Sequence, residues 1–162
     1  VIYNRVRNAS EILEALGNCQ AFGLSILDAR HAGLSVSDCR AANFSAIECK
    51  CAGWTATDCR RAGFSAIECK EAGFTAYDFK KAGFTIADCK DAGLDLKSCS
   101  YAGYSFDQCK EVGFSAFECK QAGATAEECK RAGYTAAECR DAGYNAMQCK
   151  KSGFLETDLY MA

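Results

Sequence analysis

Cysteine is the residue type of this sequence with the widest range of chemistry, and its spacing is regular. Thirteen cysteines are present, and twelve of them are separated by ten residues or a multiple of ten. Thiols in such numbers can pack as small apolar side chains, form disulfides, or bind a soft metal ion such as Cu(I). The regularly spaced set is Cys19, Cys39, Cys49, Cys59, Cys69, Cys89, Cys99, Cys109, Cys119, Cys129, Cys139 and Cys149.

The replacements at the cysteine position favour packing over the other two uses. Ala29, Phe79 and Leu159 stand where the spacing calls for cysteine, and all three are apolar. A protein core tolerates such replacements, whereas a metal ligand or a disulfide partner does not. Ala29 and Phe79 also stand singly between cysteines, and the total is odd. We therefore expect a ladder of reduced thiols in the core, with some disulfides or metal binding as the alternatives.

The rest of the sequence offers little catalytic or metal-binding chemistry. Cys49 and Cys51 form the only close pair of thiols, and His31 is the single histidine. No nucleophile–base pair and no phosphate-binding glycine loop are visible. We expect no enzyme, no metal site and no cofactor. Reduced thiols would favour a reducing intracellular compartment.

The cysteines belong to a ten-residue repeat that runs unbroken from residue 21 to about residue 154. A typical unit is RAGFSAIECK at 61–70, and we number the positions of every unit from 1 to 10 as in this one. Ser65 at position 5 and Glu68 at position 8 have the spacing of a helix capping box. Gly at position 3 suits the left-handed residue that ends a helix, and Asn43 replaces it once. Each repeat is predicted to form one helix of about seven residues.

The helical periodicity assigns a role to each position. Positions 2, 6 and 9 share one face and, with the aromatic residue at position 4, form the predicted core. Helices this short must stack on neighbours to be stable. We interpret the acidic residues at position 8 and the basic residues at position 10 as inter-repeat ion pairs. No twenty-residue alternation is visible at positions 4, 6 or 7, so the helices are expected to be equivalent. The predicted fold is an all-α solenoid, with its handedness and helices per turn left open.

These decads, with their pattern AGF[ST]A-x-[ED]-x-[KR], resemble the short tandem α-helical repeats of functionally uncharacterised proteins, which often carry Leu where this chain has Cys. The resemblance covers about 130 residues and implies a solenoid of short helices. It implies no activity.

The repeat pattern also suggests the domain organisation. We predict a single continuous domain with an N-terminal tail and capping helix at 1–20, the decapeptide-repeat solenoid at 21–154, and a C-terminal cap or tail at 155–162. A solenoid needs such capping elements at its ends.

Charge and hydropathy narrow the class of partner. The 162 residues carry 19 Lys and Arg against 21 Asp and Glu, a net charge of −2. This balance gives no overall attraction to nucleic acid or to an anionic membrane. No apolar stretch is long enough for a membrane-spanning helix, so no direct membrane insertion is expected. The expected partners are therefore other proteins, including further copies of this chain in end-to-end self-association.

The outward positions suggest where such a partner would bind. Position 7 carries several apolar residues, which form either a partner surface or a layer partly buried by neighbouring helices. The unit DAGLDLKSCS at 91–100 lacks both charges of the repeat, and Gln108 also replaces an acid. A partner patch around this unit would include Phe106. The candidate surface residues are Ile47, Ile67, Tyr77, Lys97, Ser98, Ser100, Tyr101 and Phe117.

The predicted function is a non-enzymatic scaffold. It presents an extended protein-interaction surface or serves as a subunit of a larger assembly. The alternative is a thiol-rich module that stores a metal such as Cu(I) or carries out redox chemistry through its interior cysteines.

Overall fold

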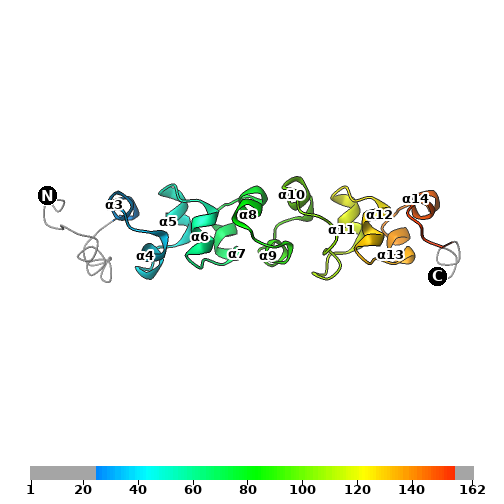
Figure 1. Ribbon diagram of the computed structural model, residues 1–162, viewed down its shortest axis with the longest axis horizontal. Coiled ribbons are helices and arrows are strands. Elements are labelled where there is room, and N and C mark those ends of the chain that lie inside the picture. Colours follow the sequence, from blue (N-terminus) through cyan, green and yellow to red (C-terminus); the bar gives the residue numbers. More distant parts are fainter. Residues whose placement is uncertain (1–24, 156–162) are drawn as a thin grey trace. The chain divides into compact units, whose positions relative to one another are not determined.

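The computed structural model describes residues 25–155, which form twelve short α-helices and no strand. Figure 1 shows these helices, one per repeat except at 106–111. Their bounds are α3 Ile26–His31, α4 Val36–Ala41, α5 Ala46–Cys51, α6 Ala56–Arg61, α7 Ala66–Glu71, α8 Ala76–Ala82, α9 Ile86–Asp91, α10 Leu96–Tyr101, α11 Ala116–Gln121, α12 Ala126–Arg131, α13 Ala136–Asp141 and α14 Ala146–Lys151. The predicted all-α solenoid architecture is confirmed. The two predicted terminal elements lie outside the described residues.

Each described helix begins after the predicted N-cap residue at position 5. In α7 the Ser65 hydroxyl accepts a hydrogen bond from the Glu68 N–H at 3.2 Å, and the Glu68 carboxylate accepts one from the Ser65 N–H at 2.7 Å. Every described helix except α10 has this reciprocal pair. In α10 the Asp95 side chain alone caps the helix. Two otherwise unpaired backbone groups are thereby satisfied at nearly every helix start.

Each helix ends after six residues, or seven in α8, because the left-handed position-3 residue turns the chain. Gly63 has φ +87°, its N–H donates to the Arg60 carbonyl at 2.9 Å, and the Phe64 N–H donates to the Cys59 carbonyl at 3.0 Å. This is the Schellman arrangement of hydrogen bonds. Asn43 adopts the same conformation with φ +65°. The helices are one residue shorter than expected because the position-2 residue is usually the C-cap.

Helices two repeats apart pack side by side. The residues divide into two compact units after Gly83, and the pattern holds within each. In the first unit α4 packs on α6 and α6 on α8, which we call the even row. α5 packs on α7, and Arg30 of α3 lies 5.4 Å from the Trp54 ring that follows α5, so α3, α5 and α7 form the odd row. In the second unit the stacked pairs include α10 with α11, α11 with α13, and α12 with α14.

The core contains the predicted positions 4, 6 and 9, whereas position 2 is buried in some repeats, as at Ala82, and only half-buried in others, as at Ala62. Cys69, Ala66 and Phe64 represent positions 9, 6 and 4, and all three are buried. Among the described residues, no side chain of Ser, Thr, Asn, Gln, His, Lys, Arg, Asp or Glu is buried, and the buried hydroxyl groups belong to Tyr104, Tyr134 and Tyr144. Small side chains at positions 6 and 9 allow the helices to approach closely.

One repeat departs from the helical rule. Residues 106–112 form turns, and the Cys109 N–H bonds to the Phe106 carbonyl three residues back. The corresponding N–H of Cys119 bonds to Ser115, four residues back. Phe106 replaces the usual Ala and is buried, while Gln108 replaces the acid of the capping box. Among the described repeats, this one alone combines an aromatic residue at position 6 with the replacement of the capping acid.

Candidate interaction surface

The position-10 side chains hold neighbouring helices of a row together. The Arg40 guanidinium of α4 donates to the Ala62 carbonyl at the end of α6 at 2.9 Å, and it lies 4.9 Å from the Phe64 ring centre. A cation at this point complements the negative end of the helix and the face of the ring. We call this contact, from a position-10 side chain to the helix end and ring two repeats on, the basic brace.

The basic brace recurs in both units. Lys50 donates to the Gly73 carbonyl and lies 4.9 Å from the Phe74 ring, and Lys120 and Lys130 make the same pair of contacts in the second unit. The predicted pairing of position-8 acids with position-10 bases is present across repeats. The hydrogen bonds of the capping boxes, followed by the charges of Arg40 and Lys90, lower the pKa of the acid twenty-eight residues after each base, and Lys110 both lowers the pKa of its acid and bonds to it directly. The acids also bond within their own capping boxes, and the bases also contact carbonyls and rings.

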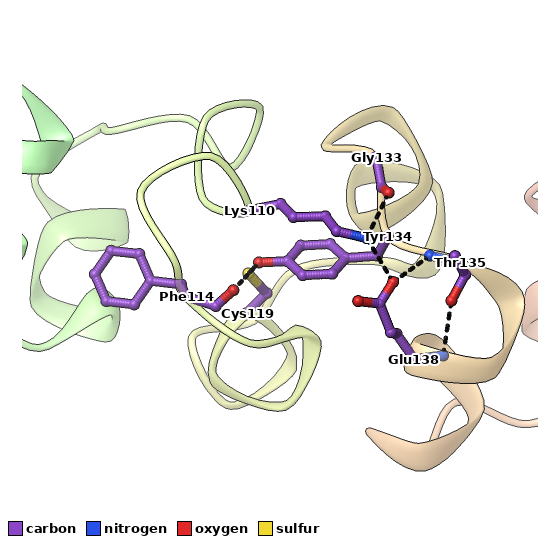
Figure 2. A network of polar contacts seen from close by, with 7 residues as sticks. All are labelled: Lys110, Phe114, Cys119, Gly133, Tyr134, Thr135 and Glu138. Atoms are coloured by element: carbon purple, nitrogen blue, oxygen red, sulfur yellow. Dashed lines mark hydrogen bonds and ion pairs between the residues drawn. The ribbon is translucent and has the colours of Figure 1, made fainter.

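Lys110 makes both a basic brace and an ion pair (Figure 2). Its ammonium donates to the Gly133 carbonyl at 3.0 Å and to the Glu138 carboxylate at 2.7 Å. Glu138 also accepts from the Thr135 N–H at 2.7 Å in its capping box. The hydrogen bond from Lys110, followed by that from Thr135, lowers the pKa of Glu138. The brace thus reaches the start of the next helix as well as the end of the one before it.

A buried phenol adds a second link between repeats two apart. The Tyr134 hydroxyl donates to the Phe114 carbonyl, twenty residues back, and accepts from the Cys119 thiol at 3.5 Å. Tyr104 makes the corresponding bond to the Phe84 carbonyl at 2.8 Å. Burial raises the pKa of Tyr134. Figure 2 shows the Lys110 side chain extending along the Tyr134 ring, with its ammonium 5.3 Å from the ring centre.

In the second compact unit, one pair of helices two repeats apart lacks the basic brace, because both the position-10 charge and the position-4 ring are absent. Ser100 stands at position 10 without a positive charge, and Ala124, twenty-four residues later, lacks the aromatic ring. Between them the space beside Gly123 is open to at least 4 Å. The basic brace is therefore absent between α10 and α11.

Row packing gathers the exposed apolar side chains of the first unit. Leu27 on α3, Ile47 on α5 and Ile67 on α7 are exposed by 50%, 51% and 51%, and all three belong to the odd row. Position 7 of the even row carries Ser37 and Thr57 instead, followed by Tyr77. The expectation of no twenty-residue alternation at position 7 is therefore wrong in this unit. We call Leu27, Ile47 and Ile67 the apolar row.

Comparison with known families agrees with the geometry. A family model described as a decapeptide repeat region matches residues 15–86 and 83–156. The chain belongs to this decapeptide repeat family. No curated protein and no solved structure matches it. In the part of the decapeptide repeat chain that the structure describes, no helix has the length and apolar character needed to cross a membrane.

In the second compact unit of this decapeptide repeat protein, the exposed aromatic side chains on helices are at other positions. Tyr101 on α10 is exposed by 81% and Phe117 on α11 by 56%, and α10 packs on α11 at the step without a brace. Lys97 and Ser98 are exposed on α10, and Ser100 is half-buried.

Two further candidate residues lie elsewhere. Phe106 is buried, so its expected place in a partner patch is wrong; its ring fills the core of its own turn-forming repeat. Tyr77 is exposed on the even row, with the Lys81 ammonium 5.5 Å from its ring centre.

The interior cysteines of the decapeptide repeats form the third feature. From Cys39 to Cys149 every position-9 cysteine is reduced, outside any disulfide, and at most 1% exposed, whereas the off-register Cys51 is exposed. Cys19 lies outside the described residues. Burial raises the pKa of Cys49 to about 12, so this thiol is neutral near pH 7. Among residues 25–155, no three His, Cys, Asp or Glu side chains are placed to hold a metal ion.

Proposed function

We propose that this decapeptide repeat protein is a non-enzymatic scaffold whose apolar row binds a protein partner. The observation that carries the proposal is the collection of Leu27, Ile47 and Ile67 onto three helices of one row, each half-exposed. Scattered exposed apolar residues are ordinary, but an aligned series offers a partner a continuous apolar contact. Removal of this surface from water favours association.

The basic braces support the proposal because they fix the spacing of the row. Lys50 connects α5 to the end of α7, and Arg30 connects α3 to the ring after α5. A surface held in one arrangement loses little conformational entropy when a partner binds. The scaffold therefore presents a preorganised surface.

The non-enzymatic part of the proposal rests on how the reactive side chains are occupied. The position-5 Ser and Thr hydroxyls of the described helices and most acids of these repeats bond each other in capping boxes, as Ser65 does with Glu68. The described ladder thiols are at most 1% exposed, and burial raises the pKa of Cys49 and Cys139 to about 12. A nucleophile needs access to its substrate, which burial denies to every one of these thiols.

The test compares two variants of the full chain in quantitative capture from a lysate of cells in which the protein is native. One variant carries Leu27→Ser, Ile47→Ser and Ile67→Ser, and the matched control carries Tyr77→Ser on the even row. We expect proteins that the wild type and the control retain but the triple variant loses. Identical retention by all three chains would contradict the proposal.

A stability measurement separates the surface role from partial burial. Because the three side chains are half-exposed, each Ser substitution should lower the free energy of unfolding by no more than about 1 kcal/mol. Losses well above this, with capture unchanged, would show that the apolar row serves packing rather than binding.

A further inference from the structure

The basic brace at Lys110 shows how this chain surrounds a positive charge. The Lys110 ammonium donates to the Gly133 carbonyl after α12 at 3.0 Å and to the Glu138 carboxylate at the start of α13 at 2.7 Å (Figure 2). The ring of Tyr134 lies 5.3 Å from the same ammonium. A carbonyl, a carboxylate and the face of a ring therefore receive one cation from a helix two repeats earlier.

One repeat earlier, the chain has the same two acceptors but no base of its own to bind them. Ser100 stands at the position of the base, while Gly123 and Glu128 stand at the positions of the carbonyl and the carboxylate. Glu128 accepts a hydrogen bond from the Thr125 N–H at 2.8 Å, the bond that also orients the acid in Figure 2. We call Ser100, Gly123 and Glu128 the open brace.

The space beside the open brace is accessible. Nothing lies within 4 Å of the place where a Cβ on Gly123 would stand, whereas the Lys120 ammonium lies 2.8 Å from the corresponding place on Gly143. Among residues 25–155, no side chain donates to the Gly123 carbonyl and no base forms a direct ion pair with Glu128. Arg131, on the same helix as Glu128, pairs instead with Asp107 at 2.5 Å.

Two exposed aromatic side chains lie on the helices that the open brace would have joined. Tyr101 follows Ser100 on α10 and is exposed by 81%, and Phe117 on α11 is exposed by 56%. The two helices pack on each other. Aromatic side chains are enriched in protein interfaces, where a few of them supply much of the binding energy. They favour a protein as the source of the cation, because a free ion would leave both rings in water.

We propose that the open brace binds an arginine or lysine side chain of a protein partner, which takes the place of the missing position-10 base. The chemistry of this side chain follows from the chain's own braces, which use the Arg40 guanidinium and the Lys110 ammonium in the same role. The proposal goes beyond the scaffold function of the apolar row, since all of its residues belong to the second compact unit.

The first experiment supplies the base from within the chain. Ser100→Lys places at position 10 the residue that most other repeats have there, and it should raise the thermal unfolding midpoint by about 1–3 °C. The matched control is Met147→Lys, which adds the same charge at a side chain exposed by 68% and should give no rise. No rise for Ser100→Lys, or an equal rise for the control, would show that the acceptors are not placed to bind a cation.

The second experiment tests the partner chemistry with the fluorescently labelled full chain on immobilised degenerate peptides. The central residue of each peptide library is fixed as arginine, lysine, norleucine or glutamate. We expect retention on the arginine and lysine libraries to exceed that on the norleucine library by about threefold, the size of an exposed ionic contact. Ser100→Lys should abolish this preference because it fills the open brace, and Met147→Lys should keep it.

Glu128→Gln tests the carboxylate separately. Gln148 forms a complete capping box with Asn145, so a glutamine at 128 can keep the helix start while it removes the charge. This variant should also lose the preference for basic peptides. Equal retention on all four libraries, a preference that survives in Ser100→Lys, or an equal loss in Ser100→Lys and Met147→Lys would overturn the proposal.

Discussion

Replacement of Gly63 by Ala adds one carbon atom, the Cβ, and tests the basic brace that Arg40 makes beside it. Gly63 has φ +87°, and a Cβ there would lie 2.2 Å from the Arg40 Nη1 atom. The methyl group therefore does two things at once. It places an L-side chain in the left-handed region, and it displaces the guanidinium from the Ala62 carbonyl at 2.9 Å and from the Phe64 ring at 4.9 Å.

The two effects have separable magnitudes. The left-handed conformation costs a non-glycine residue about 1–2 kcal/mol. Loss of the exposed charged hydrogen bond costs about 1 kcal/mol and loss of the cation–π contact about 0.5 kcal/mol. Gly63→Ala should thus destabilise the wild-type chain by about 3 kcal/mol and an Arg40→Ala chain by only about 1.5 kcal/mol.

Urea unfolding of the wild type, the two single variants and the double variant gives the coupling free energy. We expect the double variant to be more stable than the sum of the single effects by about 1–1.5 kcal/mol. Gly33→Ala is the control, because φ is +83° and the space beside Gly33 is open to at least 4 Å. It should lose the same free energy with and without Arg40. Equal losses for Gly63→Ala in both backgrounds would refute the brace.

The remaining predictions concern the caps, the phenols and acid. Tyr144→Phe removes the hydrogen bond to the Ala124 carbonyl and the Cys129 contact at 3.4 Å, and should cost about 1 kcal/mol in urea unfolding. Ser65→Ala removes one half of a capping box and should also cost about 1 kcal/mol; an unchanged midpoint would count against the box. Hydrogen bonds from the N-caps lower the pKa of the capping carboxylates below the ordinary values of 3.8 for Asp and 4.5 for Glu. The folded state then binds fewer protons than the unfolded state, so stability should be full at pH 7 and should fall as the pH drops through the lowered values, which acid titration followed by circular dichroism will show.

The local structure was predictable because its signals lie within one repeat. The spacing of Ser65, Glu68 and Gly63 predicts where a helix begins and where the preceding one ends, and the structure has them there. The replacement of cysteine by the apolar Phe79 also predicted correctly that position 9 is buried. These signals act over three to ten residues and do not depend on how repeats pack.

The candidate site was less predictable because it depends on contacts between repeats. Arg40 meets Phe64 twenty-four residues later, a relation that becomes meaningful only when helices two repeats apart are known to pack together. The same packing turns Ile47 and Ile67 into neighbours of one row. One signal was nevertheless present, since Ser100 and Ala124 lack the charge and the ring as a pair.

The most direct test of the account is a distance measurement between position-7 residues. Spin labels are placed at 47 and 67 in one sample and at 47 and 57 in another, both in a chain with Cys19→Ser and Cys51→Ser, whose other cysteines are buried. The account predicts a shorter distance for 47–67, which share the odd row, than for 47–57, which lie on different rows. A 47–57 distance equal to or shorter than the 47–67 distance would contradict the two-row packing and, with it, the apolar row.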